Sequence, residues 1–143
     1  MRILLVCTGN TCRSPMAEAL LMQLAKNKGV DLECDSAGIY GLEGAPMTTH
    51  AKRVLEEDFG ISVFNHRAAP LTARQIHWAD RIIPMTDDHK LLIEQKFSAG
   101  DKILSLPKSI PDPYGGYRED YRRCAERILE GLSDLWEQGA FHE

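Results

Sequence analysis

The first 28 residues run from an apolar segment through a polar loop into a helical segment, and this order constrains the fold more than any other feature. Arg2 to Val6 is apolar enough to form a buried strand, which ends at Cys7. The segment 8–13 is polar and contains Gly9, as expected for a loop. Ser14-Pro15 then predicts a helix start, because serine can cap a helix and proline suits its first turn.

The alternation of strand and helix continues along the remaining chain. We expect strands at 2–6, 32–37, 80–85 and 102–106, and helices at 16–28, 48–59, 72–78, 86–97 and 117–138. The length of 143 residues suits a single domain spanning 1–143. This order predicts an α/β sandwich with a parallel sheet and helices on both faces. Because ligands of such folds bind beyond the carboxyl ends of the strands, the loops after the first and fourth strands are the expected site.

Composition argues against several classes of protein. A net charge of −4 does not suit a nucleic-acid binder, which usually carries a basic face. No apolar run approaches the 18 residues of a membrane span, and the N-terminus lacks the pattern of a signal peptide. The four cysteines are therefore expected to be reduced thiols of a cytoplasmic protein. They show no zinc-type spacing, so we expect neither a metal nor another cofactor.

The loop Cys-Thr-Gly-Asn-Thr-Cys-Arg-Ser, residues 7–14, combines a nucleophile with an anion site. Successive backbone N–H groups between a strand and a helix can surround one anion, assisted by the helix N-terminus. Arg13 adds a planar fork that matches two phosphate oxygens, and these positive groups would favour the thiolate of Cys7. The pattern predicts that Cys7 attacks phosphorus while the loop and Arg13 hold the equatorial oxygens.

A second candidate group is Asp112, in the proline-rich segment after the fourth expected strand. A thiophosphate intermediate requires protonation of the leaving group and later deprotonation of water, and one carboxyl group can perform both tasks. Pro111 and Pro113 restrict the backbone on both sides. An Asp-Pro pair is also an ordinary turn, so the residues alone leave both interpretations open.

Taken together, these motifs resemble the low-molecular-weight protein tyrosine phosphatase family over essentially the whole chain. The resemblance includes 14–18, Asp35-Ser36-Ala37-Gly38, Asn65-His66, Ala79-Asp80 and Asp112-Pro113-Tyr114. It implies a flavodoxin-like three-layer sandwich with a four-stranded parallel sheet. It further implies that Cys7 is the nucleophile, Arg13 the phosphate clamp and Asp112 the general acid. By the same resemblance the phosphate-binding loop is Thr8, Gly9, Asn10, Thr11, Cys12, Arg13 and Ser14, and it is braced by Asn10, Ser14, Ser36 and His66.

Two positions bear on the substrate. Relatives that act on phosphotyrosine commonly carry Ile or Leu where this chain has Thr11, and often a second aromatic residue where it has Gly115. The form with Thr11 resembles the bacterial protein arginine phosphatase branch of the family. A hydroxyl suits the N–H donors of a guanidinium, whereas alkyl walls suit a phenyl ring. The resemblance places Tyr114 at the mouth of the pocket, and Tyr40 or Leu42 are expected on another wall.

Several interpretations remain open at the level of sequence. Thr11 could be an ordinary loop residue of a phosphotyrosine-specific enzyme. Resemblance suggests that Cys12 forms a reversible disulfide with Cys7, but Cys12 could equally be a small buried residue. More distant alternatives are a thiol-coupled arsenate reductase and a phosphocysteine carrier of a sugar transport system. The expected partners are a phosphorylated protein or peptide as substrate and phosphate as product and inhibitor, with no nucleic acid and no membrane. The protein itself is expected to be a monomer.

Overall fold

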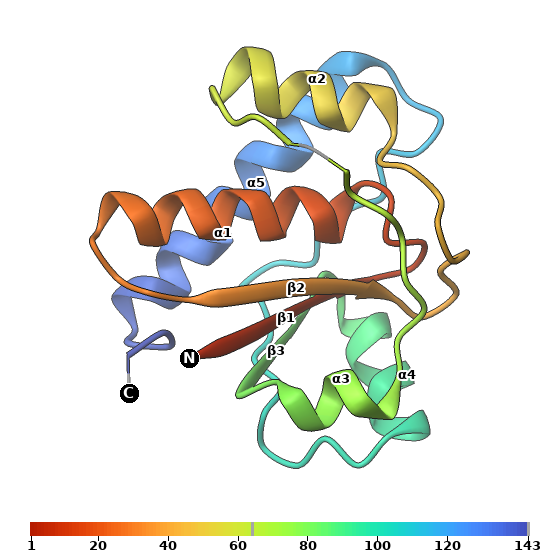
Figure 1. Cartoon of the computed structure of the whole chain (residues 1–143), viewed down its shortest axis with the longest axis vertical. Helices are drawn as coiled ribbons and strands as arrows, with labels where there is room; N and C mark the ends of the chain where they lie inside the picture. Colours follow the sequence, from red (N-terminus) through yellow and green to blue (C-terminus); the bar gives the residue numbers. More distant parts are fainter. Residues whose placement is uncertain (64, 143) are drawn as a thin grey trace.

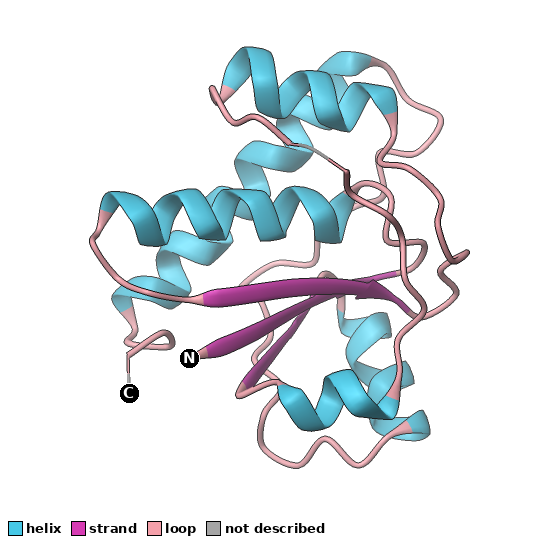
Figure 2. Ribbon diagram, viewed as in Figure 1, coloured by secondary structure: helices cyan, strands magenta, loops and turns pink. Residues whose placement is uncertain are grey.

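A computed structural model describes residues 1–63 and 65–142 and shows an α/β fold (Figures 1 and 2). The strands are β1 (Arg2–Cys7), β2 (Glu33–Gly38) and β3 (Arg81–Pro84). The helices are α1 (Arg13–Asn27), α2 (Thr49–Asp58), α3 (Ala73–Trp78), α4 (Asp87–Lys96) and α5 (Arg118–Glu137). The predicted parallel sheet between helices is thereby confirmed.

The three strands lie in the order β2-β1-β3 and are all parallel. Ile3, Leu4, Leu5 and Val6 of the central strand are fully buried. A strand covered on both faces needs apolar residues at every position, which explains a continuous run in place of an alternating one. Cys7 ends β1 beside Gly38 of β2, at the carboxyl edge of the sheet.

Helices cover the two faces of the sheet (Figure 1). The face toward α1, α2 and α5 packs around Ile3 and Leu5, and the face toward α3 and α4 packs around Leu4 and Val6. Successive side chains of a strand point to opposite faces, so one apolar run supplies both cores. Each such side chain contributes about 1.5–3 kcal/mol when it is fully buried.

The expected fourth strand at 102–106 does not form in the described part of the chain. Only Ile103 bridges to the sheet, in parallel with Ile82, through hydrogen bonds of Ile82 N to Lys102 O and Leu104 N to Ile82 O, both 2.9 Å. The chain then leaves the sheet toward Pro107, which has no N–H to continue a ladder. The described chain therefore forms three parallel strands, and segment 102–106 adds only a single bridge at the edge where the fourth strand was expected.

Helix starts agree with the sequence except at α1. Thr72 and Thr86 cap α3 and α4 by accepting hydrogen bonds from backbone N–H groups of the first turn, as their residue type favours. Ser14, expected to cap α1, lies inside its first turn, and the N-cap is Cys12 without a side-chain cap. The Ser14 hydroxyl contacts the Cys7 sulfur instead, so it belongs to the site rather than to the helix end.

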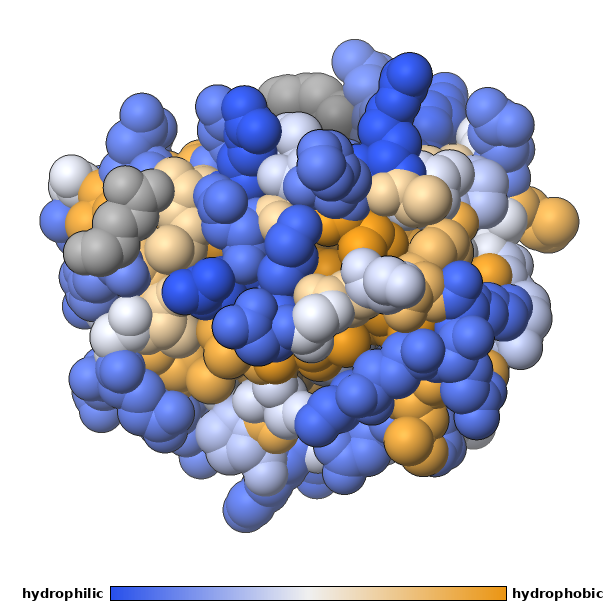
Figure 3. Space-filling view, turned by 90° about the horizontal axis from the view of Figure 1, so that it is seen from below, coloured by the Kyte–Doolittle hydropathy of each residue, from blue (hydrophilic) through white to orange (hydrophobic). Residues whose placement is uncertain are grey.

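Among the described residues, no helix combines the length and apolar character needed to cross a bilayer. Seen from the side of α3 and α4, the surface is mostly hydrophilic around a central apolar area (Figure 3).

Candidate active site

The loop between β1 and α1 lies at the carboxyl edge of the sheet, where Cys7 is almost completely buried. Gly38, at the end of the neighbouring strand, permits this arrangement. A Cβ atom on Gly38 would lie 2.7 Å from Thr8 O and 2.9 Å from Asn10 N, both backbone atoms. Only glycine allows the end of β2 to approach the loop so closely.

The sulfur of Cys7 has two neighbours that can donate hydrogen bonds. The Ser14 hydroxyl lies 2.9 Å away and the backbone N–H of Asn10 3.3 Å away. Asn10 Nδ2 donates to Ser14 Oγ at 2.8 Å, which leaves the Ser14 proton free to point at the sulfur. Both donors favour a negative charge on the Cys7 sulfur, the form required of a nucleophile.

Asn10 holds the loop in shape from within. It is fully buried and adopts a left-handed backbone with φ of 59°, a conformation that asparagine tolerates better than most residues. Besides Ser14, its amide nitrogen donates to Ser36 Oγ at 3.0 Å, and its amide oxygen accepts from Ala69 N at 3.0 Å. His66 Nε2 lies 2.8 Å from the Asn10 carbonyl oxygen. The four residues expected to brace the loop are thus in one network.

Ser36 extends this network to a buried carboxyl group. Its hydroxyl donates to Glu18 Oε1 at 2.6 Å. Burial raises the pKa of Glu18, the hydrogen bond from Ser36 lowers it, and nearby Asp35 raises it. This role of Glu18 was not predicted from sequence, because its partner lies 18 residues away on a different element.

The interior of the loop offers hydrogen-bond donors that have no protein partner. Within the described chain, the backbone N–H groups of Gly9, Thr11 and Cys12 donate to no backbone or side-chain acceptor. The first turn of α1 contains no acidic side chain. Unpaired N–H groups at a helix N-terminus favour an anion, which agrees with the anion cradle predicted from sequence.

Arg13 reaches back over this loop and is held at one end. It is 5% exposed, its Nη1 donates to Ile110 O at 3.0 Å, and its Nη2 donates to Thr8 Oγ1 at 3.2 Å. Its Nε is buried without a hydrogen-bond partner in the described chain. A buried unpaired N–H is costly, and an oxyanion in the loop would supply the missing acceptor.

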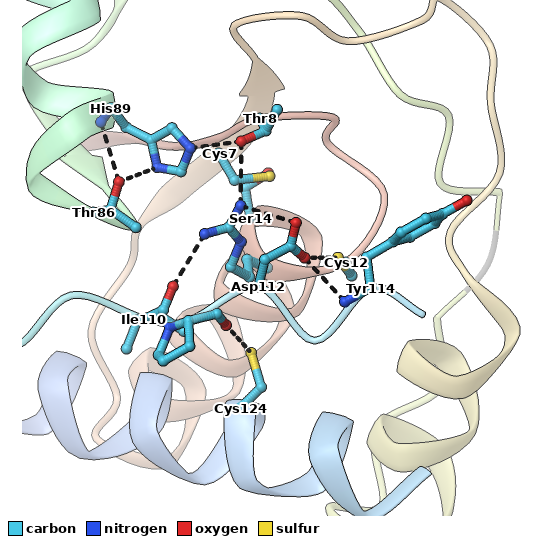
Figure 4. Close-up of polar contacts among 12 residues, drawn as sticks. Cys7, Thr8, Cys12, Ser14, Thr86, His89, Ile110, Asp112, Tyr114 and Cys124 are labelled. Atoms are coloured by element: carbon cyan, nitrogen blue, oxygen red, sulfur yellow. Dashed lines mark hydrogen bonds and ion pairs between the residues drawn. The ribbon is translucent and has the colours of Figure 1, made fainter. Parts of the chain in front are cut away.

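Asp112 lies beside Arg13 although the fourth strand is absent. The hydrogen bond of Ile110 N to Met85 O, 2.8 Å, ties the Asp112 loop to the end of β3. Asp112 Oδ2 is 3.6 Å from Arg13 Nη2, and Oδ1 accepts from Tyr114 N at 3.0 Å (Figure 4). Its side chain remains 50% exposed, so a bound substrate can reach the carboxyl group.

Cys12 contacts the same carboxylate from the loop. Its Sγ lies 3.8 Å from Asp112 Oδ1, and Cys7 and Cys12 are both free thiols here. Burial raises the pKa of Cys12 to about 12, with further contributions from Cys7 and Asp112. Cys12 is therefore a neutral thiol at neutral pH.

The residues expected at the rim are exposed. Tyr40, Leu42 and Tyr114 are 60%, 76% and 74% exposed, and the Tyr114 ring projects outward beyond Asp112 (Figure 4). Lys96 of α4 lies 4.6 Å from the Tyr40 ring centroid. Thr11 is half-buried, and its hydroxyl makes no hydrogen bond within the described chain, which leaves it available to a ligand.

Two further cysteines lie apart from each other. Cys124 of α5 lies beneath the Asp112 loop, with its Sγ 4.0 Å from Pro111 O, whereas Cys34 lies on β2 near Glu18. Burial raises the pKa of both thiols to about 12. The pair of neighbouring extra thiols that an arsenate reductase would use is therefore not formed by Cys34 and Cys124.

The structure gives no indication of a metal site in residues 1–63 and 65–142, where no group of three potential ligands occurs. A hollow of about 860 Å³ lies along α1 and is lined in part by Glu18, Ser36 and His66. Neither Cys7 nor Arg13 lines it, so this hollow is not part of the candidate active site.

A buried thiol in a loop rich in N–H donors, close to a guanidinium and a carboxyl group, is the arrangement of a cysteine-dependent phosphatase. The model of the low molecular weight phosphotyrosine protein phosphatase family matches residues 2–140, so the chain belongs to this family. It is 44% identical to a protein-arginine-phosphatase of Geobacillus stearothermophilus, over 93% of this chain and 91% of that protein.

Two other similarities extend the comparison. A low molecular weight protein-tyrosine-phosphatase PtpB of Staphylococcus haemolyticus is 32% identical, over 94% of this chain and 97% of that protein. Among solved structures, a YwlE arginine phosphatase mutant with a phosphorylated active-site serine in place of cysteine superimposes with a TM-score of 0.91. It is 34% identical and covers 100% of this chain and 98% of that one.

Proposed function

We propose that this chain hydrolyses phosphoarginine in proteins through a phosphocysteine intermediate on Cys7. The observation that carries the proposal is the loop itself: a buried sulfur with two donors, three unpaired backbone N–H groups and an unpaired Arg13 Nε. In-line attack on phosphorus needs donors of this kind for the equatorial oxygens, and all of these groups belong to the loop 7–14.

In the first step the Cys7 thiolate attacks phosphorus, an S–P bond forms and the bond to the leaving group breaks. The loop N–H groups and Arg13 stabilise the charge on the equatorial oxygens. Protonated Asp112 gives its proton to the departing nitrogen. In the second step Asp112 takes a proton from water, the water oxygen attacks phosphorus, and the S–P bond breaks to release phosphate and the thiolate.

Support for arginine over tyrosine comes from Thr11 and from the ranking of relatives. The chain is 44% identical to an arginine phosphatase and 32% identical to a tyrosine phosphatase. The unpaired Thr11 hydroxyl can accept a hydrogen bond from a guanidinium, which presents several N–H donors and no acceptor. A phosphotyrosine ring would make no use of that hydroxyl.

The test compares phosphoarginine, phosphotyrosine and phosphoserine peptides side by side with EDTA present. We expect the highest kcat/KM on phosphoarginine and no turnover by Cys7→Ser. Thr11→Val removes only the hydroxyl and should lower the preference for phosphoarginine over phosphotyrosine, whereas Thr11→Ser should retain it. Higher kcat/KM on phosphotyrosine would identify a tyrosine phosphatase, and accumulation of phosphocysteine without release of phosphate would identify a carrier.

Asp112 can be tested through the leaving group. Arginine is the poorer leaving group, since the guanidinium of arginine is a much weaker acid than the phenol of tyrosine. Asp112→Asn should therefore lower turnover of phosphoarginine by about 10²–10⁴-fold. Formation of phosphocysteine from para-nitrophenyl phosphate, whose leaving group is more acidic, should be reduced less. Equal losses in that first step would remove Asp112 from leaving-group protonation.

The proposal also includes the finer expectations from sequence. Segment 102–106 corresponds to the fourth strand position of a flavodoxin-like sheet, begun by the bridge between Ile103 and Ile82. The chain acts as a monomer on a phosphorylated protein or peptide, and phosphate is both product and competitive inhibitor. Light scattering and inhibition by inorganic phosphate test these two points.

A further inference from the structure

His89 of α4 is a buried polar residue that the reaction steps above do not use. It is 5% exposed and lies 81 residues from its partner Thr8, at the opposite side of the loop from the Asn10 brace. Its Nε2 lies 2.8 Å from Thr8 Oγ1, and its Nδ1 lies 2.9 Å from Thr86 Oγ1 (Figure 4).

The hydrogen bonds form a chain that ends at the guanidinium. Thr86 caps α4 by accepting from His89 N at 3.1 Å, so the ring is fixed at the helix start. Thr8 Oγ1 accepts from Arg13 Nη2 at 3.2 Å. The same hydroxyl therefore joins His89 on one side to Arg13 on the other.

The positive charge of Arg13 determines which atoms donate and which accept along this series of hydrogen bonds. A nearby cation favours a lone pair on the closer ring nitrogen, Nε2, and the proton on the farther one, Nδ1. The Thr8 proton then points away from Arg13 and toward Nε2, which turns the oxygen lone pairs to the guanidinium. Burial lowers the pKa of His89 to about 4 and Arg13 adds to the shift, while Asp88 and Asp112 oppose it, so the ring is neutral at neutral pH.

We propose that His89 is a positioning residue: its Nε2 accepts the Thr8 proton and thereby keeps Thr8 an acceptor that orients Arg13 for the phosphoryl group. The inference rests on the proposed function of the same site and adds a residue to it. Arg13 donates hydrogen bonds from Nη1 to Ile110 O and from Nη2 to Thr8 Oγ1. Loss of the hydrogen bond to Thr8 would let the guanidinium rotate, and catalysis is sensitive to small displacements of such groups.

Two substitutions of His89 distinguish the contact of Nδ1 with Thr86 from the contact of Nε2 with Thr8. In His89→Asn the short amide can replace Nδ1 at Thr86 but does not reach Thr8. In His89→Gln the longer amide oxygen reaches the position of Nε2 and can accept from Thr8. We expect about a tenfold loss of kcat/KM and a tenfold weaker inhibition by phosphate in His89→Asn, and changes within about twofold in His89→Gln. His77→Asn, at an exposed histidine on α3, is the matched control.

A purely structural role at the start of α4 predicts the reverse order, with His89→Asn near wild type and His89→Gln impaired. That result would overturn the proposal, as would equal effects of the two substitutions. A second test places His89→Asn in a Thr8→Val background, where the hydroxyl is absent and no further loss is expected. An additional tenfold loss in that background would show that His89 does not act through Thr8.

Nitrogen NMR of the histidine rings reports the tautomer of His89 in the wild-type protein, so it tests the direction of these hydrogen bonds independently of turnover. The His89 ring, assigned by its loss in His89→Gln, should be the neutral tautomer protonated at Nδ1. Protonation at Nε2 would overturn the proposal. If the wild-type protein hydrolysed no phosphorylated peptide, the proposed function would fail, while phosphate binding by calorimetry and the tautomer would still decide the role of His89.

Discussion

Replacing Asn10 should destabilise the whole protein, because its side chain joins three segments of the core. It donates to Ser14 and Ser36 and accepts from Ala69 N, over distances of 2.8–3.0 Å. Asn10→Gly removes these bonds but tolerates the left-handed φ of 59°. Asn10→Ala removes the same bonds and places a Cβ in that conformation.

The magnitude follows from counting these losses. Two buried hydrogen bonds and one part-buried hydrogen bond, at about 1 kcal/mol each, predict a loss of about 3 kcal/mol for Asn10→Gly. The left-handed conformation adds about 1 kcal/mol for alanine, which predicts about 4 kcal/mol for Asn10→Ala. A domain of this kind is stable by about 5–15 kcal/mol, so both variants should still fold.

Urea unfolding followed by the fluorescence of Trp78 and Trp136 measures both differences. A loss below about 1 kcal/mol in Asn10→Gly would show that these hydrogen bonds do not hold the loop. Equal stability of the glycine and alanine variants would show that the backbone conformation of residue 10 carries no strain.

Three further predictions concern other parts of the site. Gly38→Ala forces a Cβ against Thr8 O, 2.7 Å away, and should lower kcat/KM by about 10²-fold; unchanged kinetics would mean that the loop does not need this contact. Mild peroxide should oxidise Cys7 and Cys12 to a disulfide, with peroxide reduced to water, and dithiothreitol should restore activity; equal recovery in Cys12→Ser would exclude Cys12 as the partner. Folding raises the pKa of Glu18 above 4.5, so ionisation of Glu18 destabilises the folded protein as pH rises. The stability of Glu18→Gln relative to wild type should therefore increase from about pH 4.5 upward. A constant difference in urea unfolding between the two proteins across about pH 4–7 would refute this sign.

The sequence was sufficient for the parts of the site that are local in the chain. Cys7 and Arg13 share one loop between a strand and a helix, so their proximity follows from secondary structure alone. Asp112 could be placed at the same edge because loops after parallel strands share it. The brace of Asn10, Ser14, Ser36 and His66 came from family resemblance, since nothing in its spacing reveals its contacts.

Other features depended on packing that the sequence does not display. Segment 102–106 has the apolar content of a strand, yet only Ile103 pairs, because the chain turns away before a ladder can extend. Ser14-Pro15 has the residue types of a helix cap, but the serine hydroxyl is drawn to the sulfur. His89 gave no signal because its partner Thr8 is 81 residues distant and both residue types are common in loops and helix starts.

The loop is held from two sides by separate sets of contacts, and these sets should control different steps. On the side of β2, Asn10 positions the hydrogen-bond donors around the Cys7 sulfur. On the side of α4, His89 orients the Arg13 guanidinium through Thr8. No hydrogen bond joins the two sets directly within the described chain, and interactions without shared partners contribute independently. Asn10→Gly should therefore lower the reactivity of Cys7 toward iodoacetamide, whereas His89→Asn should weaken phosphate binding and leave that reactivity unchanged. In the double variant the losses of kcat/KM should multiply; a combined loss equal to the larger single one would mean that the loop responds as one unit and that the two sides cannot be assigned separate roles.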